Sequence, residues 1–111
     1  MRQETPVIRI KMAVIRRSHW KVNKGSNDEF IELHREFEDN YREKAGGTKM
    51  DLHEKVNGPF WVYLADVYFE DWSGMNSWND FFETEAGRDF GSKITATAEC
   101  IDEEFFLTID Y

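Results

Sequence analysis

The sequence predicts an α+β protein whose elements follow the ferredoxin-like order of strand, helix, strand, strand, helix and strand (β-α-β-β-α-β). Two observations lead to this prediction. Four short segments have the spacing or composition of β-strands, and two longer stretches carry apolar residues three and four positions apart, as amphipathic helices do. At 111 residues the chain has the length of one domain, so we expect residues 1–111 to share a single core.

The first strand is expected from Val7 to about Arg17. Every second residue from Ile8 to Val14 is apolar, and this period of two predicts a strand with one apolar face. The segment that follows, His19 to Gly25, is mostly polar and is predicted to be a loop.

The first helix is expected to begin at Ser26, because Ser26 and Glu29 have the spacing of a capping box. Its apolar stripe follows at helical spacing and consists of Phe30, Leu33, His34, Phe37 and Tyr41. Gly46-Gly47 is predicted to end this helix, since glycine adopts a left-handed backbone conformation without a steric penalty.

Two strands joined by a tight turn are expected next. Thr48–Val56 is the most polar of the predicted strands, and we place it at an edge of the sheet. Asn57-Gly58 is a strong signal for a two-residue hairpin turn. The strand after it, Phe60–Phe69, is apolar on both faces, which predicts that both faces are covered.

A second helix is expected after Ser73, which we take as its N-cap. Its apolar positions are Met75, Trp78 and Phe82. The segment Thr84–Gly87 interrupts the helix, and helical spacing then continues to Ala98.

The end of the chain is predicted to be extended. We expect Cys100 to be a small buried residue, the acidic run at 102–104 to form a solvated turn, and residues 105–111 to form the last strand.

With right-handed crossovers these elements give an antiparallel sheet of order 4-1-3-2. Two helices cover one face of such a sheet, so the other apolar face of Phe60–Phe69 needs a partner. We therefore expect a twofold homodimer in which two sheets pack together as a dimeric α+β barrel. The alternative is that charged side chains leave this face hydrated: Arg9, Lys11, Asp66 and Asp110.

Composition excludes several classes of partner. The net charge of −8 argues against binding to nucleic acid or to an anionic membrane surface. A single cysteine excludes an intrachain disulfide, and the three histidines fall in separate segments without metal-ligand spacing, so no metal site is expected. No apolar run has the length of a membrane span and no signal segment is recognised, so a cytoplasmic location is expected.

Three consecutive segments carry a family resemblance: Val67–Trp72, Met75–Phe82 and Thr84–Gly87. This pattern of a strand, an acidic-aromatic turn, a small helix and a short break resembles the dimeric α+β barrel superfamily, in particular its antibiotic-biosynthesis-monooxygenase-like and stress-responsive barrel domains. The resemblance implies the fold and the dimer described above. It also implies a place among cofactor-independent oxygenases, haem-degrading enzymes, isomerases or proteins without known activity.

The resemblance does not extend to haem degradation, which in this superfamily uses an asparagine on the first strand and a histidine on the last helix. The segment Val7–Arg17 has no asparagine, and no histidine follows His53. We expect no cofactor. Oxygenases of this superfamily also use an asparagine and a tryptophan near the cavity, for which Asn76, Asn79 and Trp78 are candidates.

Several side chains are candidates for lining a mostly apolar cavity between sheet and helices, with His34 as its polar member: His34, Phe37, Tyr63, Trp78 and Phe82. Arg9 and Lys11 are candidates for holding a carboxylate. For each of these residues the alternative is structural. The rings then pack a solid core, His34 bonds to the backbone, and nearby acids neutralise the two cations.

Three functions remain open on the sequence alone. The first is a protein that binds an apolar or amphipathic small molecule, with cofactor-independent monooxygenase-like activity. The second is a non-catalytic binder of a long-chain, fatty-acid-like carboxylate. The third is a module that only dimerises.

Overall fold

The computed structural model describes residues 13–58 and 61–109. The elements along the chain are β1 (Val14–Val22), α1 (Asn27–Asn40), β2 (Lys49–Glu54), β3 (Val62–Phe69), α2 (Ser73–Glu83), α3 (Glu85–Thr97) and β4 (Ala98–Leu107). The strands form one antiparallel sheet in the order β2-β3-β1-β4. This confirms the predicted α+β, ferredoxin-like order, with the second helix broken in two.

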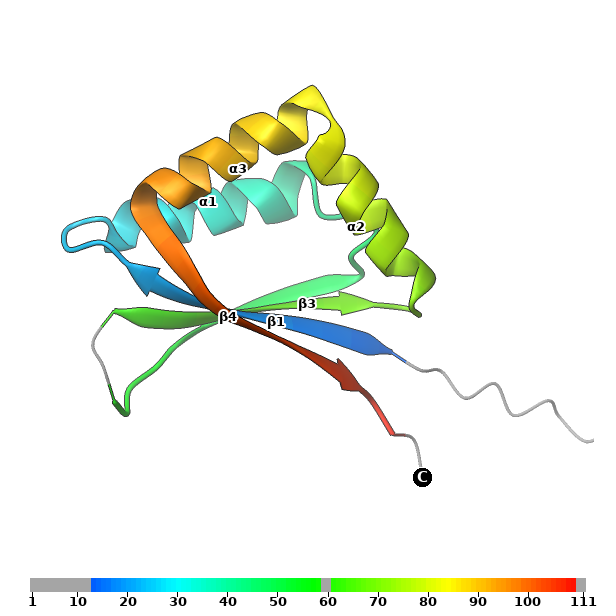
Figure 1. The fold of residues 1–111 in the computed structure, drawn as a ribbon, viewed down its shortest axis with the longest axis horizontal. Helices are drawn as coiled ribbons and strands as arrows, with labels where there is room; N and C mark the ends of the chain where they lie inside the picture. Colours follow the sequence, from blue (N-terminus) through cyan, green and yellow to red (C-terminus); the bar gives the residue numbers. More distant parts are fainter. Residues whose placement is uncertain (1–12, 59–60, 110–111) are drawn as a thin grey trace, which may run out of the picture.

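All three helices lie on one face of the sheet, and the opposite face carries no helix (Figure 1). The core fills the space between the helices and the sheet. Its most deeply buried rings are Phe30 and Phe37 of α1 and Phe69 of β3. The polar strand β2 lies at an edge, as predicted, because it pairs with β3 alone.

The predicted first strand ended too soon. Residues 7–12 lie outside the described residues, and β1 extends to Val22 through the segment predicted to be a loop. Val14, Ser18 and Val22 are buried on the helix side of β1. Because polar Ser18 occupies a core-facing position, the apolar alternation stops there although the strand continues.

The predicted last strand began too late. β4 starts at Ala98 and contains the acidic run that was predicted to be a turn. These acids are compatible with a strand because β1 supplies partners: Arg16 pairs with Glu103, and His19 lies beside Glu104. Cys100 also lies in β4 and is exposed, so its predicted burial was wrong.

The helix ends differ in detail from the sequence prediction. Ser26 is the N-cap of α1, but its side chain makes no capping hydrogen bond. α1 ends at Asn40 and turns continue to Gly46, which has a φ of +85°. Ser73 is the first residue of α2 rather than its N-cap, and its backbone N–H donates to Asp71 Oδ1 at 2.8 Å.

The break between α2 and α3 follows from two residues of the predicted interruption. Thr84 caps α3, since its hydroxyl accepts a hydrogen bond from the Gly87 backbone N–H at 3.1 Å. A side chain at Gly87 has no room, because a Cβ atom there would lie 2.1 Å from the Phe81 carbonyl oxygen. The glycine therefore lets α3 start directly against the end of α2.

Candidate functional site

A cavity of about 240 Å³ lies between the sheet and the helices. Its sheet side is formed by Arg16, Ser18, Trp20, Met50, Ala65, Val67, Cys100 and Glu103. Its helix side is formed by His34, Phe37, Trp78, Phe82, Phe90, Gly91, Ile94 and Thr95. Since an apolar cavity of about 150 Å³ is large enough to bind benzene, this one has room for a small organic molecule.

Aromatic rings make the helix side of the cavity rigid. Phe37 stacks on Phe82 with ring centres 5.9 Å apart, and it meets Trp78 at 5.3 Å. Trp78 in turn meets Phe69 edge-on at 5.7 Å. Large rings that contact one another in this way hold α1 and α2 at a fixed distance above Ala65, whose small side chain leaves space over the centre of the sheet.

His34 supplies a defined polar group on the helix side. Its Nδ1 lies 2.9 Å from the Phe30 carbonyl oxygen, and a carbonyl oxygen only accepts, so this hydrogen bond assigns the proton to Nδ1. Burial lowers the pKa of His34 below its ordinary value of 6.5, so the ring is neutral at pH 7. Nε2 is then an unprotonated acceptor, and no described group of the protein hydrogen-bonds to it.

An ion pair forms the polar part of the sheet side. Arg16 pairs with Glu103, and its guanidinium carbon lies 5.2 Å from the centre of the Trp78 ring. The Arg16 side chain is only 14% exposed. The cation of the cavity is therefore already neutralised by a carboxylate and stacked on an aromatic face.

Ser18 also lines the cavity, but its hydroxyl is used within the sheet. It accepts a hydrogen bond from Trp20 Nε1 at 2.8 Å and donates to the Ala65 carbonyl oxygen at 3.3 Å. Cys100 contributes a thiol whose pKa is raised, first by burial and then by the charge of Glu103. A thiol with a raised pKa is a weak nucleophile at neutral pH.

The structure brings four of the predicted cavity residues together: His34, Phe37, Trp78 and Phe82. Tyr63 does not line this cavity. Its ring packs on Phe30 at 5.3 Å, and its hydroxyl accepts a hydrogen bond from Asn27 at 3.0 Å. The two asparagines considered as oxygenase residues, Asn76 and Asn79, are exposed on α2 and do not line the cavity.

Arg9 and Lys11 lie outside the described residues. Among residues 13–58 and 61–109, the cation that lines the cavity is Arg16, which is not one of the site residues predicted from the sequence. Its position two residues after apolar Val14 was the available signal, because alternate residues of a strand share a face.

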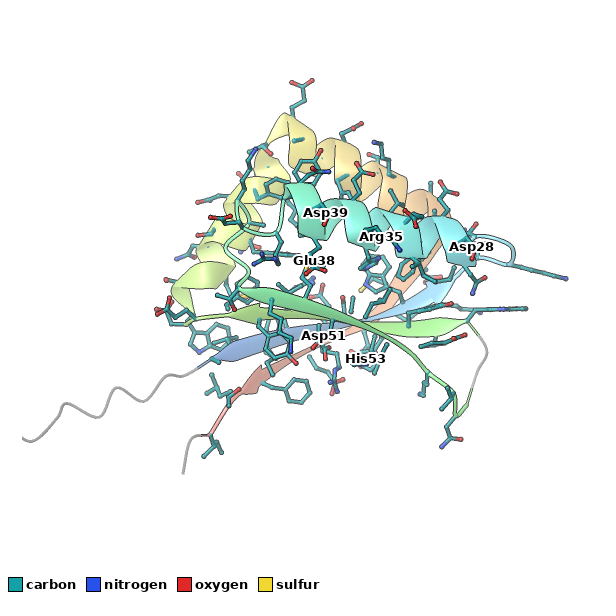
Figure 2. All side chains as sticks on the ribbon, turned by 180° about the vertical axis from the view of Figure 1, so that it is seen from behind. Asp28, Arg35, Glu38, Asp39, Asp51 and His53 are labelled. Atoms are coloured by element: carbon teal, nitrogen blue, oxygen red, sulfur yellow. The ribbon has the colours of Figure 1, made fainter. Side chains whose placement is uncertain are left out.

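The uncovered face of the sheet combines apolar and charged side chains. Asp66, at the centre of β3, is 2% exposed and pairs with Arg17 of β1. Asp51 and His53 of β2 lie on the same face, away from the helices (Figure 2). Within the described part of the chain, no helix is long and apolar enough to cross a membrane.

No protein-family model matches the chain, and no curated protein resembles it in sequence. Solved structures do resemble its fold. A protein from Bordetella bronchiseptica assigned as an antibiotic biosynthesis monooxygenase has a TM-score of 0.73 at 13% identity, over 88% of this chain and 98% of that one. SnoaB, a cofactor-independent oxygenase from Streptomyces nogalater, has a TM-score of 0.72 at 11% identity, over 90% and 96%.

A conserved protein of unknown function from Bacteroides thetaiotaomicron has a TM-score of 0.68 at 15% identity, over 88% of this chain and 99% of that one. At such identities the likeness concerns the fold. The chain therefore has the fold of solved proteins assigned as antibiotic biosynthesis monooxygenases, which is the fold that its sequence predicted.

Proposed function

We propose that this protein binds a small aromatic or otherwise apolar molecule with one hydrogen-bond-donating end in the cavity between sheet and helices. The observation that carries the proposal is His34. It is a neutral imidazole whose Nε2 accepts hydrogen bonds, set among Phe37, Trp78 and Phe82. Pockets of this composition bind an apolar body by contact and orient it through a few polar groups.

A carboxylate ligand fits the cavity less well than a donor ligand. Arg16 is the cation it would need, but Arg16 is already paired with Glu103. A fatty-acid-like carboxylate must displace that carboxylate and also meets the acceptor nitrogen of His34. A hydroxyl group has neither problem, because it donates to His34 Nε2 and leaves the ion pair intact.

A monooxygenase-like activity is the catalytic form of this proposal. His34 Nε2, an unprotonated acceptor, is the group that would take a proton from a bound hydroxyl and leave an electron-rich oxyanion. Burial lowers the pKa of His34, so the ring acts here as a weak base. The fold shared with SnoaB, a cofactor-independent oxygenase, supports this choice. Molecular oxygen is the co-reactant that such an activity requires.

We further propose that the protein acts as a homodimer through the uncovered sheet face and β4. Large apolar side chains of β4 are exposed in the single chain: Ile101, Phe105, Phe106 and Leu107. Exposed apolar groups this concentrated are typical of an interface, and a stable one buries at least ~1,200 Å² in total.

A matched set of three probes tests the ligand: 1-naphthol, naphthalene and 1-naphthoate, titrated by fluorescence at pH 7.5. We expect 1-naphthol to bind best, because it alone can donate to His34 Nε2. Replacing His34 with Leu should reduce its affinity to that of naphthalene. His53→Leu is the control, since His53 lies on the other face of the sheet.

Two outcomes contradict the proposal. One is that none of the three probes binds, which favours the module that only dimerises. The other is that 1-naphthoate binds best and His34→Leu changes nothing, which favours the carboxylate binder. Oxygen consumption with 1-naphthol, measured with wild type and His34→Leu, then separates an enzyme from a carrier.

A further inference from the structure

One imidazole and two carboxylates meet on the face of the sheet that the helices leave uncovered. His19 of β1 lies opposite Asp102 of β4, and Glu104 follows two residues later on the same face of β4. One ligand atom of each residue lies within 4.8 Å of the other two, and His19 Nε2 is 2.5 Å from Glu104 Oε1. The spacing of these residues in the sequence gave no sign of this group, because two strands far apart in the chain bring it together.

We propose that His19, Asp102 and Glu104 bind a first-row divalent metal ion, with Zn²⁺ as the probe. An imidazole nitrogen favours zinc, iron or nickel over magnesium and calcium, and carboxylate oxygens complete mixed sites of this kind. A neutral imidazole and two carboxylates carry two negative charges, which match a divalent cation. Three protein ligands leave at least one position for water or another group.

An irregularity of the sheet completes the ligand set. The register of β1 against β4 shifts between His19 and Trp20, so that Trp20 faces Cys100 while His19 faces Asp102. Ile101 is the extra residue. In a regular ladder Ile101 would face His19, and Asp102 would share the helix side with Ser18. The shift therefore moves one carboxylate to the face where the imidazole and the second carboxylate lie.

The ion pair between His19 and Glu104 does not explain why a second carboxylate, that of Asp102, lies beside them. The two neighbouring arginines are engaged elsewhere. Arg17 donates to both carboxylate oxygens of Asp66 at 2.8 and 2.9 Å, although it also feels the charge of Glu104. Arg16 pairs with Glu103. Asp102 Oδ1 accepts a hydrogen bond from the Glu103 backbone N–H at 2.9 Å, and among the described residues no hydrogen bond is made to its second oxygen.

The test uses the full-length untagged chain, stripped with EDTA and dialysed. Zinc is titrated in competition with a chromophoric chelator. We expect one Zn²⁺ per chain, and a loss of affinity of at least about tenfold in each of His19→Ala, Asp102→Asn and Glu104→Gln. Co²⁺ gives a second readout on wild type, because its visible absorption changes when an imidazole nitrogen enters the coordination shell.

Two control variants match the chemistry of the ligands at other places on the sheet. His53→Ala removes an exposed imidazole from β2, and Glu99→Gln removes an exposed carboxylate from β4. Both should keep the zinc affinity of wild type. The proposal is overturned if wild type binds no zinc beyond the level of the ligand variants. It is also overturned if folded His19→Ala and Glu104→Gln bind zinc as wild type does. This inference is independent of the proposed cavity ligand.

Discussion

Arg17 and Asp66 form a bidentate ion pair across the two central strands of the sheet, β1 and β3. Nε and Nη2 of Arg17 donate to the two carboxylate oxygens at 2.8 and 2.9 Å. Asp66 is 2% exposed and Arg17 is 33% exposed, so the pair holds a carboxylate that contacts almost no water. Hydrogen bonding to Asp66 raises the pKa of Arg17 above its ordinary value.

Replacing Arg17 with Met should therefore destabilise the fold. The variant removes both hydrogen bonds of Arg17 to the buried Asp66 carboxylate and leaves only the exposed His53 imidazole beside it, at 3.9 Å. We expect this to cost on the order of 2–4 kcal/mol of unfolding free energy. Urea denaturation at pH 7.5 measures the difference in unfolding free energy between this variant and wild type. Arg16→Met is the control and should cost less than about 1 kcal/mol, because its partner Glu103 is half exposed. A double variant, Arg17→Met with Asp66→Leu, should recover much of the loss, since no unpaired charge remains.

The proposed dimer predicts a mass of twice 13.2 kDa in sedimentation equilibrium. Leu64→Asp should convert it to the monomer, because Leu64 lies at the centre of the uncovered sheet face and a charge there would have to be desolvated. Ile31→Asp is the matched control, because Ile31 is exposed on α1 and should tolerate the charge. A monomeric wild type would contradict the dimer.

The burial of His34 predicts that the protein loses stability in acid. Its pKa lies below 6.5 in the folded chain, because burial disfavours the charged ring. As the pH falls below 6.5, the unfolded chain takes up this proton before the folded chain does, so unfolding becomes more favourable. Between pH 7.5 and pH 5.5, wild type should lose on the order of 1 kcal/mol more than His34→Gln. Urea midpoints at the two pH values measure the difference, and equal losses would contradict the assignment.

Two glycines of α3 should respond in opposite ways to alanine. At Gly87 a Cβ atom would meet the Phe81 carbonyl oxygen at 2.1 Å, so Gly87→Ala should cost about 3 kcal/mol. At Gly91 a Cβ atom would meet nothing within 4 Å, so Gly91→Ala should stabilise the helix by roughly 0.5–1 kcal/mol. Thermal melting of the two variants beside wild type checks both signs.

Hydrophobic patterning predicted the order of elements and of strands, but it placed the ends of β1 and β4 wrongly. Both errors fall where polar side chains occupy positions inside the sheet. Ser18 and Arg16 face the helices, and Glu103 and Glu104 pair across to β1. A pattern based on apolar alternation ends at such residues, although cross-strand pairing lets the strand continue.

The cavity residues also divide into those that could be predicted from the sequence and those that could not. Helical spacing in α1 and α2 predicts that His34 and Phe37 share one face and that Trp78 and Phe82 share another, because this spacing alone determines which residues of a helix lie on one side. All four side chains line the cavity. The sheet side could not be obtained in that way. Arg16, Glu103 and Cys100 meet there through pairing between distant strands, whose register the sequence does not state.

The extra residue at Ile101 has a consequence for comparing this chain with proteins of the same fold. Side chains of a strand alternate between the two faces of the sheet. In an alignment without a gap, one additional residue therefore matches every later residue of the strand to a residue on the opposite face. An alignment with a regular β4 must open a one-residue gap at Ile101. Without that gap Glu103 would be matched to residues of the outer face, and Glu104 to residues of the cavity. Deleting Ile101 from this chain should leave the side chains of β4 before and after it on their present faces.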